Sequence, residues 1–237
     1  MAKQLNCDKL LIVYRGNGKI TYRMDAIKKI QERLDVKVIV INYRGSFEEL
    51  SRDQMNRFRI REDNRVAMKF IRQHYKFDQY FIYGLSIGTA ICSDLILDDL
   101  IHHQDKRFSG VILDNVFTSL ANSFVVNIQN ANINALKYVP TLALSTISKA
   151  IVGFCGEQYR NNSTWKQIRR ISDQRKLIVP LLVFSSGKDK IMNPEDGHTI
   201  AKIMPNESTK YVLIENADHG SGSDYAVFYD EIEQFMS

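Results

Sequence analysis

Residues 79–93 read QYFIYGLSIGTAICS, and this stretch decides the fold. Its first five residues are mostly aromatic or β-branched and favour a strand, whereas the residues from Thr89 onward favour a helix. Between them lies Gly84-Leu85-Ser86-Ile87-Gly88, which has the pattern G-x-S-x-G. A serine in such a sharp strand-to-helix turn needs a glycine on each side, because larger side chains would clash there. The stretch therefore predicts a reactive Ser86 at the end of a strand.

Short apolar runs recur along the rest of the chain, and amphipathic stretches of helical periodicity separate them. This alternation is typical of an α/β fold in which helices cover both faces of a mostly parallel sheet. The strands are expected at Leu10–Tyr14, Val36–Asn42, Gln79–Tyr83, Gly110–Leu113, Leu181–Phe184 and Tyr211–Ile214. The helices are expected at Tyr22–Leu34, Arg59–Gln73, Gly88–His102, Pro194–Ile203 and Tyr225–Met236.

Residues 119–174 interrupt this rhythm, since they begin rich in Asn and then carry long apolar stretches before a polar end. One interpretation is a small lid or cap inserted into the domain. The other is an ordinary crossover helix with extra turns, because a long connection in a compact domain is usually functional but need not be.

The length of 237 residues and the 44% hydrophobic content fit one domain that spans residues 1–237. The apolar run at residues 10–13 is too short for a signal peptide, and no stretch is long enough to cross a membrane. The three cysteines, Cys7, Cys92 and Cys155, are widely spaced and odd in number. This spacing is typical of reduced thiols and indicates a cytoplasmic protein.

The net charge is +5, and the basic residues are scattered apart from clusters at residues 52–65 and 166–176. Asp53, Glu62 and Asp63 interrupt the first cluster at helical spacing. This pattern indicates a solvated helix face and not a phosphate-binding patch, so no nucleic-acid partner is expected.

An activated serine needs a histidine to take its proton, and His219 is the best placed of the five histidines. It follows the last expected strand in a turn-rich loop, at the carboxyl edge of the sheet where catalytic groups of open α/β sheets lie. The others are expected at the surface: His74, His102, His103 and His198.

A carboxylate must hold that histidine, and Asp189 ends the loop after the Leu181–Phe184 strand. The order Ser86, Asp189, His219 is the order nucleophile, acid, base. Asp114 is a serious rival because it also ends a strand, although it could instead be a structural cap. Asp218 and Asp224 lie beside His219 in the sequence and are weaker rivals.

The oxyanion formed during acyl transfer needs backbone donors. One is expected from Ile87, the residue after the nucleophile. The loop at residues 14–18 follows the first strand and contains two glycines, and Asn17 is the best second donor in it. The alternative is a plain turn between a strand and a helix.

With these motifs, the sequence resembles the α/β-hydrolase superfamily, and within it the abhydrolase-domain, prolyl-peptidase-like branch. The resemblance covers nearly the whole chain and implies Ser86 as nucleophile, His219 as base and Asp189 as its partner. The motifs that carry it are Arg15-Gly16-Asn17, Tyr43-Arg44-Gly45, Gly84 to Gly88, Asn115 to Ser119, Pro180 to Asp189 and Asp218-His219-Gly220.

The sequence departs from the family pattern at both sides of the first strand. Arg15 stands where the family usually has histidine, and the loop after Asn17 is about one residue shorter than expected from the family pattern. The chain begins almost at the first strand, which predicts a minimal N-terminus. An uncovered sheet edge would then favour a contact between two copies of the chain.

The leading hypothesis is a serine hydrolase that cleaves an ester, thioester or amide through an acyl-enzyme on Ser86. A carboxylesterase, thioesterase or lipase-like enzyme fits better than a peptidase, and no metal or organic cofactor is implied. The apolar parts of residues 119–174 favour a hydrophobic acyl group and a peripheral membrane contact. The second hypothesis is a catalytically impaired member of the fold that binds a ligand or partner, because of Arg15 and the short loop.

Overall fold

A single parallel sheet organises the computed structural model, which describes residues 8–16, 24–44, 56–102, 108–123 and 159–237, with single residues 125, 143 and 146. Its strand order is β2-β1-β3-β4-β5-β6, and every neighbouring pair runs parallel. The strands are β1 (Lys9–Tyr14), β2 (Lys37–Ile41), β3 (Gln79–Leu85), β4 (Gly110–Asp114), β5 (Leu181–Ser186) and β6 (Thr209–Ile214).

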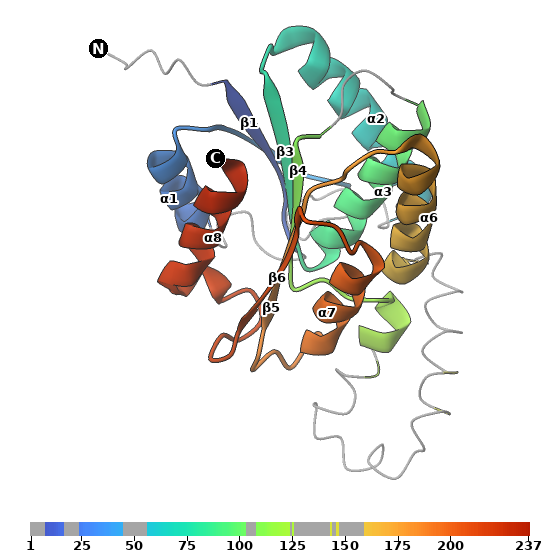
Figure 1. The fold of residues 1–237 in the computed structure, drawn as a ribbon, viewed down its shortest axis with the longest axis vertical. Coiled ribbons are helices and arrows are strands. Elements are labelled where there is room, and N and C mark those ends of the chain that lie inside the picture. Colours follow the sequence, from blue (N-terminus) through green and yellow to red (C-terminus); the bar gives the residue numbers. More distant parts are fainter. Residues whose placement is uncertain are drawn as a thin grey trace.

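Helices cover both faces of this sheet (Figure 1). One face carries α1 (Met24–Leu34) and α8 (Ala226–Met236). The other face carries α2 (Arg57–His74), α3 (Ile87–His102), α6 (Asn161–Arg175) and α7 (Pro194–Ile203). The predicted α/β class is therefore confirmed.

Successive residues of each strand point to opposite faces, so the strands contribute to two separate cores. On β1, Leu10 and Ile12 join the core under α2, α3, α6 and α7, whereas Leu11 and Val13 join the core under α1 and α8. Strands buried on both faces read as continuous apolar runs, which is why the sequence located them.

The expected strands and helices are confirmed, with small differences at their ends. Strand β3 runs two residues further than expected, because Gly84 pairs with Tyr14 and Leu85 pairs with Asp114. The apolar pattern does not show this extension, since a glycine weakens a strand signal.

Much of the predicted lid, residues 119–174, lies outside the described residues. Its final part forms α6, which connects β4 to β5 and packs on α3. Both interpretations of residues 119–174, a small lid and an extended crossover helix, stay predictions.

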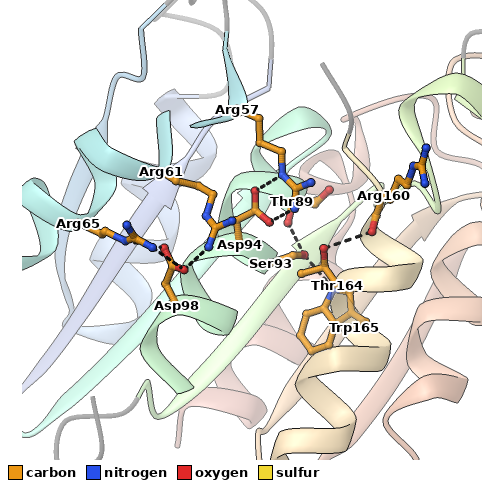
Figure 2. A network of polar contacts seen from close by, with 10 residues as sticks. All are labelled: Arg57, Arg61, Arg65, Thr89, Ser93, Asp94, Asp98, Arg160, Thr164 and Trp165. Carbon is orange, nitrogen blue, oxygen red and sulfur yellow. Dashed lines mark hydrogen bonds and ion pairs between the residues drawn. The ribbon is translucent and has the colours of Figure 1, made fainter. Parts of the chain in front are cut away.

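The prediction of a solvated face for the arginines of α2 is wrong for Arg57 and Arg61. Arg57 makes a bidentate ion pair with Asp94 of α3, at 2.7 and 2.5 Å. Arg61 and Arg65 both bind Asp98, one turn further along α3 (Figure 2). Periodicity within one helix could not reveal these pairs, because it relates only residues three or four apart. Asp98 lies 37 residues after Arg61 and 33 residues after Arg65.

No helix in the described ranges combines the length and apolar character needed to cross a bilayer.

Candidate active site

The carboxyl ends of the parallel strands meet at one edge of the sheet, and the predicted site residues lie there. Ser86 follows β3 directly, Asp189 lies in the loop after β5, and His219 lies in the loop after β6. The topology thus gathers three residues that are far apart in the sequence.

Ser86 lies in a strained turn. Its φ is 54°, in the left-handed region that side chains other than glycine rarely adopt. Its N–H donates to the carbonyl of Asp114 at 2.9 Å, which ties the turn to β4. Backbone strain at a serine between a strand and a helix is the geometry that the G-x-S-x-G pattern predicts.

Both glycines of the motif are required by close packing. A Cβ on Gly84 would lie 2.6 Å from the carbonyl oxygen of Gly88. A Cβ on Gly88 would lie within 3.0 Å of the carbonyl oxygens of Tyr14 and Arg15. The turn therefore packs directly on the end of β1. Gly16 also lies against it, since a Cβ added to Gly16 would lie 3.3 Å from the Cβ of Ser86.

Asp189 and His219 are hydrogen-bonded, with 2.7 Å between Oδ2 of the aspartate and Nδ1 of the histidine. The side chain of Asp189 is 1% exposed, and its other oxygen accepts the N–H groups of Ile191 and Met192 at 2.7 and 2.9 Å. An ionised carboxylate only accepts, so Nδ1 of His219 carries the proton and Nε2 is left as an acceptor. This arrangement fixes both the tautomer and the direction of the imidazole ring.

The two loops that carry this pair support each other. Gly187 donates to the carbonyl of Ile214 at 3.0 Å, and Lys188 donates to that of Ala217 at 2.9 Å. A Cβ on Gly187 would lie within 3.0 Å of the backbone of Glu215, so only glycine permits this approach. The contact between the loops holds Asp189 at a fixed distance from His219.

Asp114, the main rival of Asp189, has a different partner. Its Oδ2 accepts the hydroxyl of Tyr83 at 2.7 Å, and both residues are buried. Asp218, a weaker rival, is exposed, and its backbone N–H donates to the hydroxyl oxygen of Ser221 at 2.7 Å. Asp224 lies in the short helix η1 (Gly222–Asp224) and is exposed. Of these carboxylates, Asp189 is the one that is bonded to His219.

The other described histidines lie away from this pair. His74 and His102 are exposed ends of α2 and α3. His198 lies on α7, where its ring stacks on Tyr211 at 5.1 Å between centroids. His103 lies outside the described residues.

The region of the expected oxyanion hole is described in part. Ile87 is the first residue of α3 and is buried, whereas Asn17 lies outside the described residues. Arg15 is only 7% exposed, and its Nη2 donates to Oδ1 of Asn42 at 2.9 Å. Burial raises the pKa of the neighbouring Tyr43, and the positive charge of Arg15 opposes that rise.

The sequence analysis named Asn115 only as the start of a family motif, and the structure shows that it joins the ends of β4 and β5. Asn115 has a φ of 53°, and its side-chain oxygen accepts the N–H of Ser186 at 2.9 Å. Asparagine tolerates the left-handed region better than most residues, and its place directly after a strand was the available signal.

Among the described residues, no three His, Cys, Asp or Glu side chains lie close enough together to hold a metal ion.

Comparison with known proteins gives a clear result for the fold. No protein-family model matches the sequence, and a search of curated proteins finds no significant match. Among solved structures, the Pyrococcus furiosus esterase Pf2001 is similar, with a TM-score of 0.68 and 12% identity over 97% of this chain and 81% of that one. An alpha-beta hydrolase from Vibrio vulnificus has a TM-score of 0.70 and 17% identity, over 95% of this chain and 73% of that one.

Est1E from Butyrivibrio proteoclasticus, solved with ferulic acid bound, is similar over 98% of this chain and 90% of its own. Its TM-score is 0.62 and its identity is 13%. Identities this low establish the fold alone. The chain has the α/β-hydrolase fold, and its place in the prolyl-peptidase-like branch stays a prediction.

Proposed function

We propose that the protein is a serine hydrolase in which Ser86, His219 and Asp189 form the catalytic triad. The observation that carries the proposal is the 2.7 Å bond between Asp189 and His219 on the sheet edge where Ser86 has a φ of 54°. A strained serine and an oriented histidine at one edge of this fold are the two parts that nucleophilic catalysis needs.

In the first step, Nε2 of His219 takes the proton of Ser86 as Oγ attacks the carbonyl carbon of the substrate. The carbonyl π bond opens, and its electron pair becomes an oxyanion. The N–H of Ile87 donates to this oxyanion, with a second donor from the loop after β1, for which we propose Asn17. Asp189 stabilises the imidazolium that forms.

The tetrahedral intermediate then collapses to an acyl-enzyme, and the leaving group departs with the proton from His219. A water molecule gives a proton to His219 and attacks the acyl carbon. A second collapse releases the carboxylic acid and returns the proton to Ser86, so the enzyme is regenerated.

Carboxylic esters are the substrate class that we favour over thioesters and amides. Three similar structures are an esterase, a ferulic-acid-bound Est1E and a hydrolase, which supports an ester without identifying it.

The test is steady-state hydrolysis of p-nitrophenyl acetate and longer p-nitrophenyl esters. We expect Ser86→Ala and His219→Ala each to lose activity by a factor of at least about 10³, since each removes a member of the unit. His198→Ala is the matched control, because it removes a histidine from α7 and should leave kcat unchanged. Equal activity of Ser86→Ala and the wild-type protein would contradict the proposal.

A further inference from the structure

The peptide group between Ser86 and Ile87 determines the direction of the proposed oxyanion donor. The peptide between Ser86 and Ile87 carries the carbonyl of Ser86 at one end and the N–H of Ile87 at the other. These two groups point in opposite directions because the peptide is planar and trans. Whatever fixes the Ser86 carbonyl therefore also fixes the direction in which the Ile87 N–H points.

Thr89 binds that carbonyl twice. Its N–H donates to the oxygen of Ser86 at 2.9 Å, and its hydroxyl Oγ1 donates to the same oxygen at 2.6 Å. Thr89 is fully buried, so water does not compete for these bonds. A backbone N–H would suffice to begin a helix, and the hydroxyl adds a second bond to a peptide whose preceding residue is strained.

The carbonyl of Thr89 is bound by Ser93, one turn further along α3, and Ser93 is in turn bound from α6. Ser93 Oγ donates to this carbonyl at 2.7 Å, and Trp165 Nε1 of α6 donates to Ser93 Oγ at 2.9 Å (Figure 2). Ser93 and Trp165 are both 0% exposed. Buried hydrogen bonds thus run from Trp165 of α6 to the Ser93 hydroxyl, from there to the backbone carbonyl of Thr89, and from the N–H and hydroxyl of Thr89 to the turn at Ser86.

The opposite side of the same helix is held by α2. Asp94, next to Ser93, is 3% exposed and accepts the bidentate ion pair from Arg57. The first two turns of α3 are therefore clamped between two helices. Buried polar groups with good hydrogen-bond partners favour one arrangement of a core over others.

We propose that Thr89, Ser93 and Trp165 are positioning residues that aim the Ile87 N–H at the oxyanion. Thr89 acts directly on the Ser86–Ile87 peptide, and Ser93 and Trp165 act through Thr89. This inference rests on the proposed serine-hydrolase function. It predicts a loss that appears in the chemical step and not in substrate binding, because the oxyanion exists only after attack.

Thr89→Val is the main test, since it removes the hydroxyl and keeps the shape. We expect kcat for p-nitrophenyl acetate to fall about tenfold and KM to stay within about twofold of wild type. This fall in kcat is smaller than the roughly 10²–10³-fold fall that follows removal of a direct oxyanion donor, because the donor itself is kept. Thr89→Ser keeps the hydroxyl and should restore at least about half of the wild-type kcat. Ser93→Ala and Trp165→Phe test the rest of the chain and should lower kcat about threefold.

Thr164→Val is the matched control. Thr164 is also buried on a helix, and its hydroxyl also bonds a backbone carbonyl, that of Arg160 at 3.2 Å. This bond lies within α6 and its approach, away from the Ser86–Ile87 peptide. Thermal midpoints of all variants are measured beside kcat and KM, so that loss of stability is seen separately.

The possible outcomes are distinguishable. The inference is supported if kcat of Thr89→Val is lower than kcat of Thr164→Val and Thr89→Ser restores kcat. The inference is overturned, and the proposed function is left intact, if the wild-type protein is active but Thr89→Val has the same kcat as Thr164→Val or differs from wild type only in KM. A folded wild-type protein without activity overturns both. If Thr89→Val does not fold, unchanged kcat in Ser93→Ala and Trp165→Phe overturns it.

Discussion

Gly88, two residues after Ser86, is required because backbone atoms lie too close to it for a side chain. The carbonyl oxygens around Gly88 belong to Tyr14 and Arg15, which are held in the sheet and its first loop, so they cannot move away as a flexible side chain could. By contrast, the nearest atoms around Gly16 are 3.3 to 3.6 Å from an added Cβ, a distance that a small shift can relieve.

This difference predicts a large loss of stability for one alanine substitution and a small one for the other. Gly88→Ala should lower the free energy of unfolding by about 3 kcal/mol or more, because the clash forces the backbone apart. Gly16→Ala should cost less than about 1 kcal/mol of stability but should reduce ester hydrolysis, since the added methyl group lies against Ser86. Urea denaturation and p-nitrophenyl acetate hydrolysis measure the two effects. Equal stability of the two variants would contradict the packing argument.

The carboxylate of Asp189 is expected to matter for catalysis more than for stability. Asp189→Asn keeps the shape but can donate to Nδ1 of His219 through its amide, which favours the wrong tautomer of the imidazole. We expect kcat to fall by about 10³–10⁴. Asp218→Asn is the control, because Asp218 is the adjacent exposed carboxylate and its described bonds are made by its backbone. A loss in both variants would mean that general negative charge, and not the hydrogen bond, is what His219 needs.

Helices α2 and α3 are joined by charge as well as by apolar packing. Burial opposes the ionisation of Asp98, but hydrogen bonds from Arg61 and Arg65 outweigh it and lower the pKa of the carboxyl. A carboxyl whose pKa is lower in the folded state stabilises the fold above the unfolded pKa of about 4, and this contribution is lost as the pH falls through the folded pKa.

Asp98→Asn should therefore be less stable than wild type by about 1–2 kcal/mol at pH 7, and this gap should shrink below about pH 4. Urea denaturation of both proteins at pH 7, 5, 4 and 3 measures the gap. The difference between the two proteins is the informative quantity, because burial raises the pKa of Asp196, which has the opposite effect on stability at acid pH. Asp173→Asn, which removes a surface ion pair within α6, should change little at any pH. A gap that is constant from pH 7 to pH 3 would contradict the role of ionised Asp98.

The sequence predicted the strands and helices because their signals are local. Apolar runs mark β1 and β5, which are buried on both faces, and the G-x-S-x-G pattern marks the turn at Ser86. It also predicted the site residues at one edge, since parallel strands end on the same side. It could not predict the partners of Arg57 and Arg61, nor the chain from Trp165 to Thr89. Those contacts join helices that are far apart in the sequence, and no local pattern specifies which side chains meet across them.

The described residues form two cores that share the same strands. Leu182 belongs to one core and Leu181 and Val183 to the other, so neither face can lose its packing without loosening the sheet between them. This sharing favours cooperative unfolding even in a chain of 237 residues.

Trp165 offers a direct test of that cooperativity. It is the single tryptophan of the chain and is 0% exposed, in the core beside α3. We expect its fluorescence and the far-ultraviolet circular dichroism to change at the same urea concentration, because the two cores unfold together. A fluorescence midpoint clearly below that of the circular dichroism would show that the α2, α3, α6 and α7 face unfolds by itself.

The central claim is that Ser86 is an activated nucleophile, and covalent labelling tests it most directly. A fluorophosphonate probe phosphonylates an activated serine whatever acyl group the enzyme prefers, and tandem mass spectrometry identifies the modified residue. We predict one adduct, on Ser86, that is absent from Ser86→Ala, strongly reduced in His219→Ala and unchanged in His198→Ala. A folded wild-type protein that stays unlabelled, or that is labelled at another serine, would contradict the account.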